Sequence, residues 1–127
     1  MSTLNVSNIT DGTTTVGTSY VVNGSAKQWC RWNQTGTAAI NDSFNTSSLT
    51  DNGTGKGELT YTSNMSNGNY HIATGVGELT GGGNRGIGVR GADQTPIASG
   101  CAYFCFNTNW SGADQDLCST SVFGDLA

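Results

Sequence analysis

Turn-forming residues interrupt this chain so often that no long regular element has room to form. From residue 25 onward, short segments rich in Val, Ile, Thr, Tyr, Phe and Trp alternate with runs of Gly, Asn, Asp and Ser. This spacing is typical of strands joined by tight turns. About eight short strands in about 100 residues predict a sandwich or a barrel. We therefore predict an all-β chain with a compact antiparallel, jelly-roll-like β-sandwich.

Composition excludes most other classes. Gly, Ser, Thr and Asn supply 63 of the 127 residues, whereas Glu and Lys together supply four, too few for a helical bundle. No apolar run approaches the ~20 residues of a membrane-spanning helix, and a hydrophobic content of 35% argues against disorder. The net charge is −4 and the five basic residues are not clustered. We therefore expect no nucleic-acid partner and no membrane insertion.

Several of the expected strands contain residues that indicate how the strand is covered or connected. Trp29 and Trp32 point to opposite faces of the segment 26–33, so that strand is either covered on both sides or meets a neighbouring subunit. Asp51-Asn52-Gly53 predicts a hairpin with a type I′ turn. The most apolar run, 100–106, predicts a central strand covered on both faces. The expected strands are 26–33, 38–40, 43–49, 58–63, 70–77, 85–90, 100–106 and 117–125.

Residues 1–24 lack the apolar side chains for a core of their own. Leu4, Val6 and Ile9 lie among Ser, Asn and Thr, and the spacing of the first two favours an extended segment with one apolar face. We expect residues 1–24 to form an extended arm that docks on a partner through these three residues, and 25–127 to form the sandwich. The alternative is a frayed terminus. The first residues do not resemble a secretory signal, so we expect folding in a cytoplasm.

The four cysteines, Cys30, Cys101, Cys105 and Cys118, form no Cys-x-x-Cys pair. Cys101 and Cys105 would lie ~13 Å apart on one face of a strand, too far for a disulfide or for one tetrahedral zinc. We predict four reduced, buried, small hydrophobic residues. A cross-strand or intersubunit disulfide in an extracellular particle stays open as an alternative. We expect no metal and no cofactor.

No pattern of catalytic residues stands out. The single His cannot be paired with a nucleophile by spacing, and no Gly-x-Ser-x-Gly elbow is present. We interpret Asp114 and Asp116 as solvated loop acids rather than a glycosidase pair or a Ca²⁺ site. The sequence therefore predicts a protein that is not an enzyme, with no catalytic residues.

The polar loop 107–116 carries the best candidate binding residues. Trp110 stands among short polar side chains, and an exposed aromatic ring with amides and carboxylates nearby can stack on a sugar and hold its hydroxyls. The alternative is that Trp110 folds back as a lid on the core. The residues that we predict to bind a receptor are Asn109, Trp110, Asp114 and Gln115 from this loop, and Arg85 beside a Gly-rich loop.

Three stretches carry a family resemblance: the start Met-Ser-Thr-Leu-Asn-Val-Ser-Asn-Ile, the segment 26–55, and the ending Val-Phe-Gly-Asp-Leu-Ala. Residues 26–55 contain Ala-Lys-Gln-Trp-Cys-Arg-Trp-Asn-Gln-Thr-Gly and then Ser-Phe-Asn-Thr-Ser-Ser-Leu-Thr-Asp-Asn-Gly-Thr-Gly. Together they resemble short tail-fibre-like proteins of tailed bacteriophages, especially cyanobacterial and marine ones. The resemblance is close in 26–55 and loose in 64–116, where Cys101, Cys105 and Trp110 have no counterpart in the family pattern.

The resemblance implies a structural protein of the virion, made in the host cytoplasm. Such fibres are typically homotrimers, with an N-terminal arm on another tail, baseplate or capsid protein and a β-rich knob that meets a host-surface glycan or protein. It would place Trp29, Trp32, Phe44 and Tyr61 in the trimer interface or core. The alternatives are a decoration or connector protein of the virion without receptor binding and, less in keeping with the residues, a glycan depolymerase.

Overall fold

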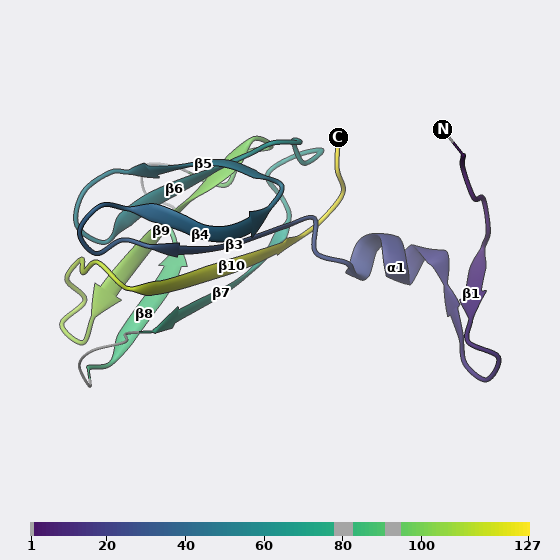
Figure 1. Cartoon of the computed structure of the whole chain (residues 1–127), viewed down its shortest axis with the longest axis horizontal. Helices are drawn as coiled ribbons and strands as arrows, with labels where there is room; N and C mark the ends of the chain where they lie inside the picture. Colours follow the sequence, from purple (N-terminus) through teal and green to yellow (C-terminus); the bar gives the residue numbers. More distant parts are fainter. Residues whose placement is uncertain (1, 78–82, 91–94) are drawn as a thin grey trace.

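Two four-stranded antiparallel sheets pack face to face (Figure 1). The computed structural model describes residues 2–77, 83–90 and 95–127. The first sheet has the order β4-β3-β10-β7 and the second the order β5-β6-β9-β8. The predicted β-sandwich is therefore confirmed. The strands are β3 (Gln28–Asn33), β4 (Ala39–Phe44), β5 (Thr46–Asp51), β6 (Lys56–Tyr61), β7 (His71–Gly77), β8 (Arg85–Val89), β9 (Gly100–Asn107) and β10 (Leu117–Phe123).

The connections differ from those of a jelly roll. The pairs β3–β4, β5–β6 and β8–β9 are each hydrogen-bonded neighbours within one sheet. In a jelly roll, paired strands wrap together from one sheet to the other, so that part of the prediction is wrong. Strands β7, β8 and β9 are followed by β10, which returns to lie beside β7 in Greek-key fashion.

A corner at Asn45 divides the expected strand 43–49 into β4 and β5, which belong to opposite sheets. Asn45 has a φ of 54°, in the left-handed region that Asn enters more readily than most residues. Its side-chain amide donates to the carbonyls of Lys27 and Ser63, and its Oδ1 accepts from the N–H of Ser63. Alternating polar and apolar residues do not reveal this corner, since its hydrogen bonds come from distant parts of the sequence.

The hairpin predicted at Asp51-Asn52-Gly53 joins β5 to β6. Its turn is not type I′, because Gly53 has a φ of 100° whereas Asn52 does not enter the left-handed region. The N–H of Lys56 donates to the carbonyl of Gly53 at 2.7 Å, and Gly55 supplies a second left-handed residue with a φ of 71°. The additional residues therefore lengthen the loop instead of forming a two-residue turn.

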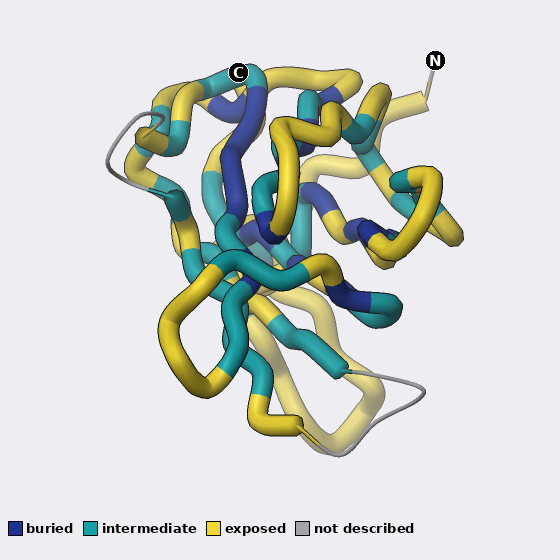
Figure 2. Tube along the Cα trace, turned by 90° about the vertical axis from the view of Figure 1, so that its left-hand side faces the viewer, coloured by how far each residue is buried: buried dark blue, intermediate teal, exposed yellow. Residues whose placement is uncertain are grey.

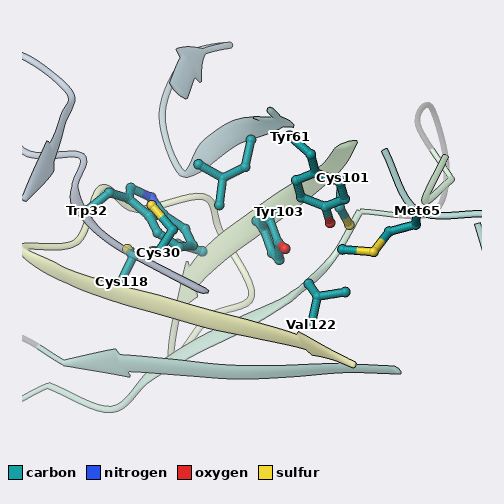
Figure 3. Packing of buried hydrophobic residues seen from close by; sticks show 10 residues of the cluster. Cys30, Trp32, Tyr61, Met65, Cys101, Tyr103, Cys118 and Val122 are labelled. Carbon is teal, nitrogen blue, oxygen red and sulfur yellow. Dashed lines mark hydrogen bonds between the residues drawn. The ribbon is translucent and has the colours of Figure 1, made fainter. Parts of the chain in front are cut away.

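The hydrophobic core lies between the two sheets (Figure 3). Trp32 is completely buried and its ring centroid lies 5.4 Å from that of Tyr103. The four cysteines are buried free thiols, and burial raises the pKa of Cys30 and of Cys101 to about 11. The buried cluster consists of Cys30, Trp32, Leu59, Tyr61, Met65, Cys101, Tyr103, Cys105, Cys118 and Val122.

The four residues that were predicted to lie in the trimer interface or the core divide into two pairs. Trp32 and Tyr61 belong to the core, whereas Trp29 and Phe44 are 38% and 54% exposed. Trp29 and Phe44 are direct cross-strand neighbours on β3 and β4, on the outer face of the first sheet. The monomer therefore presents an exposed aromatic pair on that face.

The N-terminal residues form a small unit that stands off the sandwich (Figure 1). Strand β1 (Asn8–Thr10) pairs with β2 (Thr15–Gly17), and helix α1 (Thr18–Gly24) follows. The prediction of extended backbone is thus wrong over 18–24, where a helix of seven residues forms and Lys27 Nζ donates to the carbonyl of Val22. Figure 2 shows this unit as almost wholly exposed. No helix among the described residues is both long and apolar enough to cross a membrane.

Candidate functional site

Three aromatic rings form a ladder on the outer face of the second sheet. Phe104 and Phe106 alternate along β9 with the inward-facing core residues, and their ring centroids lie 6.0 Å apart. The Trp110 ring continues the ladder, 4.8 Å from Phe106 and inclined to it by 21°. Trp110 is 77% exposed. The ladder therefore ends in an indole whose second face is open to solvent.

Asn107 holds the loop that presents Trp110. The Trp110 N–H donates to the Asn107 carbonyl, and the Asn107 N–H donates to the Ser111 carbonyl, both at 3.0 Å. The Asn107 Oδ1 accepts from the N–H groups of Asn109 and Ser111. Trp110 itself has a φ of 59°, an uncommon conformation for a bulky residue. Such backbone costs about 1–3 kcal/mol and is concentrated at functional sites.

A shallow hollow of about 220 Å³ adjoins the Trp110 ring. Strand β8 brings Arg85 directly opposite Asn107 of β9, so the two strand ends meet there. The hollow combines an aromatic wall with guanidinium, amide and hydroxyl groups, which between them donate and accept hydrogen bonds. Its volume suits one small ring rather than a drug-sized ligand. It is lined by Asn84, Arg85, Phe106, Asn107, Thr108 and Trp110.

The structure separates the five predicted receptor-binding residues. Arg85 and Trp110 meet at the hollow, and Asn109 is exposed in the same loop. Asp114 accepts a hydrogen bond from the Gly55 N–H at 2.7 Å and so ties the loop to the β5–β6 turn. Gln115 is 1% exposed, and its side-chain amide donates to the carbonyl of Ala113 in the loop. Its side chain therefore stabilises the loop and does not face a ligand. Trp110 is not a lid on the core, because it rests on an outer-face ring.

Sequence reasoning missed Phe106, Asn84 and Thr108. The alternation in 100–106 could have indicated Phe106, because Cys101, Tyr103 and Cys105 share one face of the strand and leave Phe106 on the other. The apolar character of the segment 100–106 instead suggested a strand that is covered on both faces. Residues 80–82 of the expected Gly-rich loop lie outside the described residues.

No family model, curated protein or solved structure matches this chain. The described residues contain no group of three or more His, Cys, Asp or Glu side chains that could hold a metal ion. The hollow offers one aromatic face together with neutral and cationic hydrogen-bonding groups.

Gly86 makes room for the middle ring of the ladder, and its substitution gives a test. A Cβ atom on Gly86 would lie 2.3 Å from the Phe106 ring, whereas one on Gly88 would meet nothing within 4 Å. We expect Gly86→Ala to displace the Phe106 ring and shift the tryptophan fluorescence and near-UV circular dichroism, because the Trp110 stack is lost. Gly88→Ala, on the same face of β8, should leave both spectra unchanged. Equal spectra for the two variants would contradict the packing of Phe106 between Gly86 and Trp110.

Proposed function

We propose that this chain is a tail-fibre-like structural protein of a bacteriophage virion, whose sandwich binds a carbohydrate of the host surface. The observation that carries the proposal is the exposed Trp110 ring, stacked on Phe106 and held outward by left-handed backbone. Backbone strained in this way is concentrated at functional sites. The resemblance of residues 26–55 to phage tail-fibre-like proteins supports the virion setting.

The chemistry around Trp110 favours a carbohydrate as the ligand. The open face of the indole can cover the C–H face of a sugar ring, while Asn84, Asn107 and Thr108 can exchange hydrogen bonds with its hydroxyls. Arg85 adds a planar donor suited to a carboxylate or a hydroxyl pair. The hollow has room for about one sugar ring. This combination favours one residue of a surface glycan over an extended peptide.

The N-terminal unit supports attachment to another virion protein. Leu4, Val6 and Ile9 are 83%, 39% and 46% exposed. Asp11 is the only charged residue in 1–24. Apolar residues exposed together on a nearly uncharged segment are typical of an interaction surface. We propose that this unit docks on a tail, baseplate or capsid protein, and that three copies of the chain associate.

A decoration or connector protein without a receptor is the second candidate. The exposed Trp29 and Phe44 pair on the first sheet favours it, because such a face can serve assembly alone. That candidate gives no role to the strained and exposed Trp110. Carbohydrate binding therefore separates the two.

The decisive experiment is binding of the purified full chain to an array of bacterial surface glycans and to whole host-type cells. We expect retention on a subset of glycans, with release by millimolar concentrations of the matching free sugar, because one shallow subsite gives modest affinity. A folded chain that binds no glycan and no cell would overturn the carbohydrate proposal and leave the decoration candidate. Release of reducing ends from the glycan would instead indicate a depolymerase.

A further inference from the structure

Two of the four buried thiols lie against each other across the sandwich. Cys105 belongs to β9 in the second sheet and Cys118 to β10 in the first. Their Sγ atoms are 3.6 Å apart and both side chains are completely buried. The approach still needed to reach the ~2.05 Å of a sulfur–sulfur bond is small enough for side-chain rotation to supply much of it.

The other possible partners fit less well. Cys30 faces the core from β3, where its direct neighbour on β10 is Thr120, so Cys118 lies diagonally from it. Diagonal neighbours on one sheet face are ~7–8 Å apart, beyond disulfide range without backbone movement. In Figure 3, Cys101 lies toward Met65, at the opposite end of the cluster from Cys118. Among the described residues no third His, Cys, Asp or Glu completes a metal site.

Cys105 and Cys118 flank the loop that carries Trp110, so a bond between them would also constrain that loop. Cys105 lies just before the loop 107–116, and Cys118 lies just after it. The backbone at Cys105 is already fixed, because its N–H donates to the Gly55 carbonyl and its carbonyl accepts from the Ala113 N–H. A covalent link between the two cysteines would close the base of the loop that carries Trp110 and would join the two sheets.

We propose that Cys105 and Cys118 are a disulfide-forming site, which low-molecular-weight disulfides such as oxidised glutathione oxidise. One cysteine thiolate attacks oxidised glutathione, forming a mixed disulfide and releasing one reduced glutathione. The second cysteine thiolate then displaces the remaining glutathione and forms the sulfur–sulfur bond. Two thiol protons leave the protein, the protein loses two electrons, and one oxidised glutathione becomes two reduced ones.

Burial determines when this reaction occurs. The hydrogen bond with Cys105 and the buried position raise the pKa of the Cys118 thiol, and little thiolate means slow exchange in the folded chain. Oxidation is therefore expected during folding, or when the sandwich opens, in surroundings less reducing than a cytoplasm. The residues lie 13 apart in sequence. Closing a loop of this length should raise the ratio of folded to unfolded molecules about 100-fold.

The test is refolding of the reduced, denatured full chain in glutathione buffers of fixed ratio, followed by alkylation and mass spectrometry. In an oxidising buffer we expect two alkylated thiols, at Cys30 and Cys101, and a Cys105–Cys118 cross-linked peptide. The melting temperature should rise by roughly 10 °C and return to the starting value on reduction. Neither readout depends on what Trp110 binds.

Cys101→Ala is the matched control, because this residue lies on the same strand and faces the same core as Cys105. It should still form the cross-link, whereas Cys105→Ala should not. Four alkylated thiols after oxidative refolding of the native chain would overturn the proposal, as would a cross-link between other cysteines or between chains. A cross-linked form that melts below the reduced form would overturn it as well, since the site would then not suit a disulfide.

Discussion

Replacing Trp32 with alanine is expected to lower the free energy of unfolding by about 3–5 kcal/mol, a large part of the ~5–15 kcal/mol typical of a folded domain. The indole is completely buried on β3 and stacks at an angle on Tyr103, which comes from the opposite sheet. Its removal leaves a cavity that the two sheets cannot close, since both are fixed by their hydrogen-bonded ladders. Urea unfolding followed by circular dichroism measures the loss.

Trp29→Ala is the matched control, because the same residue type lies on the same strand but on the outer face and is 38% exposed. We expect it to cost less than about 1 kcal/mol, since no internal cavity forms. If three copies associate through the Trp29 and Phe44 face, light scattering should show a trimer for the native chain and a monomer for Trp29→Ala. Equal losses of stability for the two variants would contradict the division between core and outer face.

Trp110→Ala is expected to weaken carbohydrate binding on the order of 30-fold or more, the typical effect of truncating a central tryptophan at a binding site. The variant should unfold at nearly the same denaturant concentration as the native chain, because the ring is 77% exposed and leaves no core cavity. Titration of the glycan identified on the array, followed by calorimetry, measures the affinity of both proteins.

Two further variants make this prediction specific. Phe44→Ala removes an exposed aromatic ring from the opposite sheet and should leave the affinity unchanged. Trp110→Gly should weaken binding at least as much as Trp110→Ala, yet melt at the same or a higher temperature, because glycine adopts the left-handed φ at this position without strain. Loss of stability without loss of binding in Trp110→Ala would instead assign the ring a packing role.

Much of the sandwich could be predicted from the sequence because its strands are bounded by local turn signals. The strands 26–33, 70–77 and 117–125 overlap β3, β7 and β10 to within a few residues. The corner at Asn45 was not predictable from alternation, since three hydrogen bonds from distant residues hold it. The helix 18–24 was also missed, because its Tyr-Val-Val run favours strand by intrinsic propensity.

The site was predictable in its central residue and not in its surroundings. Trp110 stood out in a polar loop, but which neighbours it meets depends on how β8 aligns with β9. That register brings Arg85 into the site opposite Asn107. Gln115 looked like a binding residue in the sequence and is buried in the structure, because the chain turns inward before β10. Polarity alone does not distinguish a residue that supports a loop from one that faces solvent.

The loop 107–116 connects one sheet to the other. The hydrogen bonds that fix the base of the loop do not involve the residues at its tip. The base is held by the hydrogen bond from the Ala113 N–H to the Cys105 carbonyl and by the one from the Gly55 N–H to the Asp114 carboxylate. The tip from Thr108 to Ser111 contributes no residue to the buried cluster. A new sequence grafted at the tip should therefore leave the sandwich intact and, if the tip binds a glycan as proposed, change which glycan is bound.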